Sequence, residues 1–167
     1  MTKPNILFIL LDDMGWKDLA CTGSTFYETP NIDRLAREGM SFTNAYASCP
    51  VCSPSRASFL TGKYPARLGL TDWIDMDGTC HPLRGRVIDA PYVKHIPEGE
   101  YTVAQALRDG GYAAWHVGKW HLGGEAYYPD KAGFDITSAA APGAILTRDI
   151  SPLMGLRRFR RGRTESI

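Results

Sequence analysis

The sequence contains little of what marks a membrane protein. The apolar run at residues 6–11 ends in two aspartates and is far shorter than the roughly 18 apolar residues that a membrane-spanning helix needs. No small-residue cleavage site follows this run, so we expect no signal peptide, no membrane partner and, for the chain as written, a soluble cytoplasmic protein. A start codon assigned too far downstream would instead make the protein periplasmic or secreted.

Cysteine and net charge are also scarce. The 167-residue chain has four irregularly spaced cysteines, too few for a disulfide scaffold, and its formal net charge is +1. The charge is unevenly distributed along the chain. Residues 136–167 carry 6 Arg and 2 acidic residues, whereas residues 1–135 carry 13 Lys or Arg and 16 acidic residues. This basic tail could be read as a nucleic-acid arm, but no nucleic-acid-binding fold accompanies it, and we expect no nucleic-acid partner.

Three segments have the pattern of β-strands. Residues 5–11 are apolar at almost every position, which is typical of a strand buried on both faces of a parallel sheet. Residues 40–47 alternate loosely between apolar and polar side chains, and residues 112–117 follow a helix signal and two glycines. The sequence therefore predicts three strands.

Helix signals lie between these strands. Residues 29–39 and 102–111 each begin with a threonine suited to a cap and end in glycine, and a third helix is expected to have Ser53 as its cap and to end at Gly62. Strands alternating with helices predict an α/β fold with a mostly parallel sheet flanked by helices. Residues 69–100 show no periodicity and are expected to form a long excursion of the kind that often carries function.

Polar side chains follow each predicted strand. The three pairs are Asp12 and Asp13, Cys52 and Arg56, and Lys119 and His121. Because the carboxyl ends of parallel strands meet at one edge of a sheet, where ligands bind in open α/β folds, we expect the three pairs to lie close together.

Each pair allows a functional and a structural interpretation. Neighbouring carboxylates repel each other, and a hard cation such as Ca²⁺ or Mg²⁺ would neutralise Asp12 and Asp13; alternatively, one caps a turn and the other faces water. Lys119 and His121 are two residues apart and would share one face of an extended segment. Single Lys and His residues are nevertheless usually solvated or structural.

The segment around Cys52 allows several chemistries. Cys49 and Cys52 form a C-x-x-C pair, which can indicate a redox site, but the surrounding sequence argues against that interpretation. A zinc site would need more ligands than Cys80 and His81 add. A helix N-terminus next to Cys52, together with Arg56, would attract an anion. The structural alternative is a buried free cysteine beside a surface arginine.

Taken together, these segments resemble the sulfatase family of the alkaline-phosphatase-like superfamily. The residues CSPSRASFLTG at 52–62 are similar to the family signature C-x-P-S-R-x-x-x-L-T-G without a mismatch. Further similarity is found, in the family's order, in NILFILLDDMG at 5–15, TPNIDRLAREG at 29–39 and GKWHLG at 118–123. The resemblance runs from about residue 4 to residue 135.

The resemblance implies a sulfuric ester hydrolase with an oxidised cysteine as its nucleophile. A separate maturation enzyme would convert Cys52 to Cα-formylglycine, and Asp12 and Asp13, with residue 52, would bind Ca²⁺ or Mg²⁺. The resemblance also implies that Arg56 would stabilise residue 52, that Lys119 would bind the sulfate, and that His121 would transfer a proton during sulfate release. The expected substrate is a small-molecule or carbohydrate sulfate ester.

The chain departs from the family pattern after residue 135. The further metal ligands, lysine and histidine that a complete sulfatase site draws on cannot be identified, and residues 136–167 show neither helix nor strand periodicity. We therefore expect residues 1–135 to be the N-terminal part of a catalytic domain and residues 136–167 a basic tail, as in a truncated or frame-shifted product. Hydrolysis of phosphonate or phosphate esters and a non-catalytic remnant that binds an anion or a partner stay open as alternatives.

Overall fold

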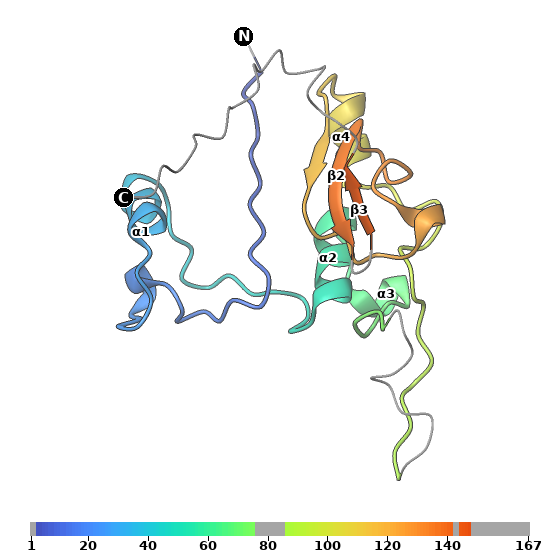
Figure 1. Ribbon diagram of the computed structural model, residues 1–167, viewed down its shortest axis with the longest axis horizontal. Coiled ribbons are helices and arrows are strands. Elements are labelled where there is room, and N and C mark those ends of the chain that lie inside the picture. The colour runs from blue at the N-terminus through green and yellow to red at the C-terminus, as the bar shows by residue number, and fades with distance from the viewer. Residues whose placement is uncertain (1–2, 76–85, 142–143, 148–167) are drawn as a thin grey trace, which may run out of the picture.

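The computed structural model describes residues 3–75, 86–141 and 144–147 (Figure 1). The elements in chain order are η1 (Ala20–Thr22), α1 (Pro30–Glu38), α2 (Cys52–Thr61), α3 (Pro65–Leu68), α4 (Val103–Asp109), β1 (Trp115–Val117), η2 (Glu125–Tyr127), β2 (Ile136–Ala141) and β3 (Ala144–Thr147). Among the helices in these ranges, none has the length and apolar content needed to cross a bilayer.

The sheet has the order β1-β2-β3, with β1 parallel to β2 and β2 antiparallel to β3. Trp115 pairs with Ile136 in the parallel ladder, and the Asp135 side chain accepts a hydrogen bond from the backbone N–H of Ala114 (2.8 Å). Parallel pairing with flanking helices confirms the predicted α/β class. Strand β2 begins directly after residue 135, in a stretch whose sequence has no usable periodicity. Pairing with β1, and not a local sequence pattern, makes this stretch a strand.

The predicted helices at 29–39 and 102–111 are confirmed as α1 and α4. Thr102 caps α4 in a capping box: its hydroxyl accepts from the N–H of Gln105, whose side chain accepts from the N–H of Thr102. The predicted end of α2 at Gly62 is also confirmed, because this residue has the left-handed φ of 69° that favours glycine. The third predicted strand is confirmed in its second half as β1. No helix or strand occurs in the described parts of 69–100.

The core lies between α2 and the segment that follows β1. Trp120, Leu122, Leu70 and Ile74 are each 2% exposed or less. They pack with five other buried residues, Ala57, Leu60, Leu68, Ile96 and Ala132. This cluster joins α2 to residues 120–122, so it holds in place two of the three segments that carry predicted site residues.

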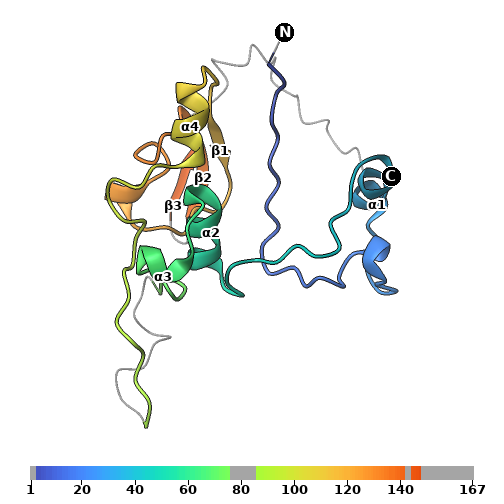
Figure 2. The same cartoon turned by 180° about the vertical axis from the view of Figure 1, so that it is seen from behind.

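The strands predicted at 5–11 and 40–47 are wrong. Neither segment forms a strand (Figures 1 and 2). Residues 6–11 are 42–85% exposed. A strand needs a neighbour for its ladder hydrogen bonds, and no strand of the described chain pairs with either segment. Instead, Phe8 stacks on Phe59 of α2 with ring centroids 4.0 Å apart. This contact places the middle of segment 5–11 against α2.

Candidate active site

Three segments distant in sequence meet at the N-terminal end of α2. Asp12 follows the extended segment 5–11, Cys52 is the first residue of α2, and Lys119 lies just after β1. The Lys119 Nζ is 2.6 Å from Oδ2 of Asp12 and 3.3 Å from Sγ of Cys52. The structure therefore brings one residue from each predicted pair into direct contact.

Arg56 joins the same three segments from the second turn of α2. Its guanidinium donates through Nη2 to Oδ1 of Asp12 (3.0 Å) and through Nη1 to the backbone carbonyl of Lys119 (2.8 Å). The Arg56 side chain is only 11% exposed, so this arrangement is held by packing as well as by charge. Arg56 is thus placed to hold the Asp12 and Lys119 segments against α2.

The charges in this cluster reinforce one another. The hydrogen bond from Lys119 lowers the pKa of Asp12 below its usual value, and Arg56 adds to this effect against the opposing effect of burial. Burial of Lys119 disfavours its charged form, but hydrogen bonds with Asp12 and Cys52 outweigh that cost and raise its pKa. Asp12 is therefore a carboxylate and Lys119 an ammonium at neutral pH.

Asp12, Asp13 and Cys52 form a potential metal-binding group. One ligand atom of each lies within 4.8 Å of those of the other two. Asp12 already has a cation on each oxygen, whereas the Asp13 carboxylate has no hydrogen bond or ion pair within the described residues. An unpaired carboxylate beside a second one fits a hard divalent cation, which takes oxygen ligands. The two carboxylates therefore suit such an ion, whereas the Cys52 sulfur, a soft ligand, would suit it only after replacement by oxygen.

His121 lies beside this cluster but does not bond to it. Its ring is buried, 8% exposed, and Nε2 is 2.7 Å from the backbone carbonyl of Ile74. Burial lowers the pKa of His121, and Lys119 and Arg56 lower it further. The prediction that Lys119 and His121 share a face of an extended segment is wrong, because His121 has a left-handed φ of 59° and the chain turns there.

One further sequence-based expectation needs correction at α2. The helix begins at Cys52 with Val51 as its N-cap, so Ser53 is not the cap. The Ser53 hydroxyl instead accepts from the backbone N–H of Ile74 (3.0 Å). Sequence reasoning missed Ser53 and Ile74 as parts of the site. The only signal was a serine within segment 52–62, which is similar to the family signature, and nothing in the sequence indicated its distant partner.

The other histidines that the structure describes are placed as structural residues. His95 stacks on Tyr127 with centroids 4.0 Å apart, and His116 packs edge-on against Trp120 and Phe134. Burial lowers the pKa of His116 to about 4, which keeps it neutral at pH 7. Cys80 and His81, the alternative zinc ligands, lie outside the described residues.

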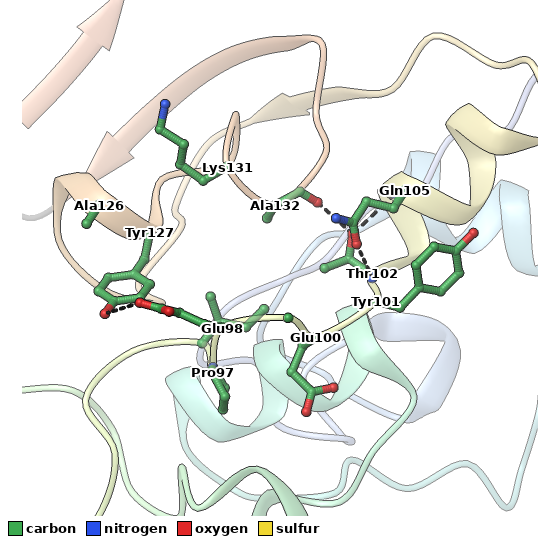
Figure 3. Close-up of a pocket in the computed structure, with 12 residues that line it drawn as sticks. Pro97, Glu98, Glu100, Tyr101, Thr102, Gln105, Ala126, Tyr127, Lys131 and Ala132 are labelled. Carbon is green, nitrogen blue, oxygen red and sulfur yellow. Dashed lines mark hydrogen bonds between the residues drawn. The ribbon is translucent and has the colours of Figure 1, made fainter.

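A separate pocket of about 300 Å³ lies between the start of α4 and η2 (Figure 3). Its polar residues are already engaged: Thr102 and Gln105 form the cap of α4, Glu100 pairs with Lys63 (2.5 Å), and the Tyr127 hydroxyl donates to Glu98. None of the predicted site residues lines this pocket.

Comparison with known proteins adds a family match. The family model described as Sulfatase matches residues 4–146, which extends past the predicted boundary at residue 135 and includes β2. The position of that boundary stays a prediction. The matched stretch contains all six predicted site residues and makes up most of the chain.

Individual relatives agree with the family match. The chain is 46% identical to the N-acetylgalactosamine-6-sulfatase of Sus scrofa over 133 residues, covering 79% of this chain and 24% of that protein. It is 40% identical to the steryl-sulfatase of Mus musculus over 139 residues, covering 79% of this chain and 21% of that protein. The chain thus spans about a quarter of the length of the curated relatives it matches.

A solved structure is similar in fold. It is described as being in complex with its substrate D-glucosamine-2-N,6-O-disulfate. The TM-score is 0.63 at 33% identity, and the alignment covers 82% of this chain and 23% of the solved one.

Proposed function

The chain belongs to the sulfatase family and has part of its alkaline-phosphatase-like fold, and from this premise we propose that it carries the nucleophile centre of a sulfuric ester hydrolase. The observation that carries the proposal is the position of Lys119 Nζ, which is shared between Asp12 and Cys52. A cation held at the nucleophile by an acidic partner is what transfer of an anionic sulfuryl group requires.

Cys52 is the proposed precursor of the nucleophile. When a separate maturation enzyme has oxidised it to Cα-formylglycine, the hydrated aldehyde supplies one hydroxyl to attack the sulfur and a second whose proton is lost as sulfate is expelled by C–O cleavage. An ordinary serine at this position would form a stable sulfate ester. Placement of residue 52 at the first turn of α2 supports this role, because backbone N–H groups there favour negative charge.

Three further site residues, Arg56, Lys119 and His121, have distinct proposed roles. Arg56 orients residue 52 and holds the Asp12 and Lys119 segments together, as its two hydrogen bonds suggest. Lys119 offsets the negative charge that develops on the ester and on the leaving oxygen. His121 accepts a proton during sulfate release, and its lowered pKa leaves it neutral and able to do so at pH 7.

Asp12, Asp13 and residue 52 are the proposed ligands of a divalent cation, Ca²⁺ or Mg²⁺. When bound, such an ion would polarise the sulfate ester and lower the pKa of an adjacent hydroxyl. With three protein ligands it would keep room for substrate or water oxygens.

The proposed substrate is a sulfate ester of a carbohydrate or a small molecule. This class is suggested by relatives named for N-acetylgalactosamine-6-sulfate and by the solved complex with a disulfated glucosamine. The proposed protein partner is the maturation enzyme that modifies Cys52.

The function is tested by assaying the purified chain from its native host with matched aryl sulfate and aryl phosphate esters, with and without Ca²⁺. We expect turnover of the sulfate ester that depends on the ion. Mass spectrometry of the peptide containing residue 52 accompanies each preparation. A fully modified chain that turns over only the phosphate would favour the phosphate or phosphonate ester alternative. Failure to turn over either ester would favour a non-catalytic remnant.

Metal binding is expected to depend on Asp13 more than on a neighbouring acid outside the cluster. Because the Asp13 carboxylate has no competing partner among the residues that the structure describes, Asp13→Asn should weaken Ca²⁺ binding by about tenfold or more in isothermal titration, since it removes one of two anionic oxygen ligands. Asp18→Asn is the matched control, because Asp18 accepts from the backbone N–H of Gly15 (2.6 Å) outside the metal-binding group. Equal affinities of the two variants would contradict the assignment.

A further inference from the structure

A short hydrogen-bonded bridge connects the residue next to the nucleophile with His121. Ser53 follows Cys52 on α2, its side chain is fully buried, and its hydroxyl accepts from the backbone N–H of Ile74 (3.0 Å). The carbonyl of the same residue, Ile74, lies 2.7 Å from Nε2 of His121. Ile74 is itself only 1% exposed, so water does not compete for these bonds.

The bridge determines which nitrogen of His121 carries the proton. A backbone carbonyl can only accept a hydrogen bond, so the nitrogen that faces it must be protonated. The ring is neutral because burial lowers its pKa, and a neutral imidazole has one N–H and one lone pair. With the hydrogen on Nε2, the lone pair is on Nδ1. That nitrogen is buried and has no hydrogen-bond partner within the described residues.

The surroundings of the ring agree with a neutral form. The charged groups that influence it are Lys119 and Arg56, which disfavour a positive ring, and Asp12, which favours one. The ring of Trp73 lies edge-on at 6.3 Å between centroids. A buried acceptor without a partner is costly in a folded protein, and in a candidate active site it is expected to have a catalytic use.

We propose that Ser53 is a positioning residue which, through the backbone of Ile74, holds His121 as the Nε2–H tautomer and so makes Nδ1 the proton-accepting atom. The catalytic use of the Nδ1 lone pair rests on the proposed function, whereas the tautomer assignment rests only on the hydrogen bonds. Ser53 acts by fixing the backbone at Ile74, whose N–H and carbonyl lie in two successive peptide planes joined at its Cα. Without the Ser53 acceptor, the Ile74 N–H would lose its partner, and the backbone dihedral angles at Ile74 could change and turn the carbonyl away from the ring.

The tautomer is tested by ¹⁵N NMR of the full chain labelled at histidine, with the His121 signals assigned from their loss in His121→Gln. In the unsubstituted chain we expect a protonated-type shift for Nε2 and an unprotonated-type shift for Nδ1. In Ser53→Ala the Nδ1–H form should increase by about two- to tenfold, the factor that corresponds to one neutral hydrogen bond. A protonated Nδ1 in the unsubstituted chain would overturn the proposal.

Two variants keep the test decisive. Ser58→Ala is the matched control, because Ser58 lies on the same helix and its buried hydroxyl has no hydrogen-bond partner in the described residues. It should leave the His121 shifts unchanged. Ser53→Cys keeps the shape of the side chain, but its sulfur is a poorer hydrogen-bond acceptor. It should also increase the Nδ1–H form of His121, so it replaces Ser53→Ala in the test if Ser53→Ala does not fold. Folded Ser53 variants with unchanged His121 shifts would contradict the role of Ser53.

Turnover of an aryl sulfate provides a separate readout. Ser53→Ala should lower kcat while leaving KM nearly unchanged, because Ser53 does not contact the substrate in this proposal. The NMR result does not require turnover, so a chain without sulfatase activity would refute the proposed function and leave the tautomer assignment standing. Turnover of the aryl sulfate by a chain whose His121 is protonated at Nδ1 would instead support the proposed function and refute the tautomer assignment.

Discussion

Replacing Cys52 with alanine should abolish the proposed sulfate ester hydrolysis, with an expected loss of at least about 10⁴-fold in kcat, because no other side chain in the described ranges is proposed as a nucleophile. Cys52→Ser should behave differently. Its hydroxyl can accept the sulfuryl group once, but without a second hydroxyl on the same carbon the resulting ester cannot expel sulfate. We expect a single turnover, detected by mass spectrometry as one sulfate bound to residue 52.

The matched control for this prediction is Cys49→Ser. Cys49 lies in the same C-x-x-C segment and is a free, half-buried thiol, but it belongs to neither the Lys119 contact nor the metal-binding group. Its replacement should leave turnover within about twofold of the unsubstituted chain, as is usual for positions outside the reacting groups. Repeated turnover by Cys52→Ser, or loss of activity in Cys49→Ser, would contradict the assignment of Cys52.

Trp120→Ala should produce the largest loss of stability. The Trp120 side chain is 2% exposed, packs in the core with Leu122 and Ile74, and donates from Nε1 to the backbone carbonyl of Tyr127 (2.8 Å). Removing a buried aromatic side chain costs about 3–5 kcal/mol. Urea unfolding should therefore show a much lower midpoint. Because Trp120 lies between Lys119 and His121, the same variant should also weaken any activity of the folded fraction.

Trp115→Ala is the control for this measurement. Trp115 lies on β1 only five positions away, but 45% of its surface is exposed. Its replacement should cost about 1 kcal/mol, because much less apolar area is returned to water. Similar destabilisation by the two variants would show that the core is not centred on Trp120.

Local signals in the sequence predicted the helices well. The Thr102 cap, the Gly62 terminus and the helix at 29–39 depend on hydrogen bonds and dihedral angles within a few residues, which a sequence window contains. Strands depend on a partner that is distant in sequence. The most apolar segment, 5–11, was therefore predicted as a strand and is exposed, whereas β2, which has no clear pattern, pairs with β1.

The candidate site shows the same division. Asp12, Asp13, Cys52, Arg56, Lys119 and His121 were all chosen from the sequence, and the structure brings the first five to one place. Their roles remain predictions. The sequence argument for placing His121 assumed an extended chain, which its left-handed backbone contradicts.

The sequence by itself determined which chemical groups are present, where α1 and α4 lie, where α2 ends, and which family the chain belongs to. Only the tertiary structure decided which atoms meet: Lys119 with Asp12 and Cys52, Arg56 with the Lys119 carbonyl, and His121 with Ile74. The physical reason is the separation of the partners, 107 residues for Lys119 and Asp12 and 47 for His121 and Ile74. Such pairs form only when the core positions their backbones, and no local preference of either residue specifies the other.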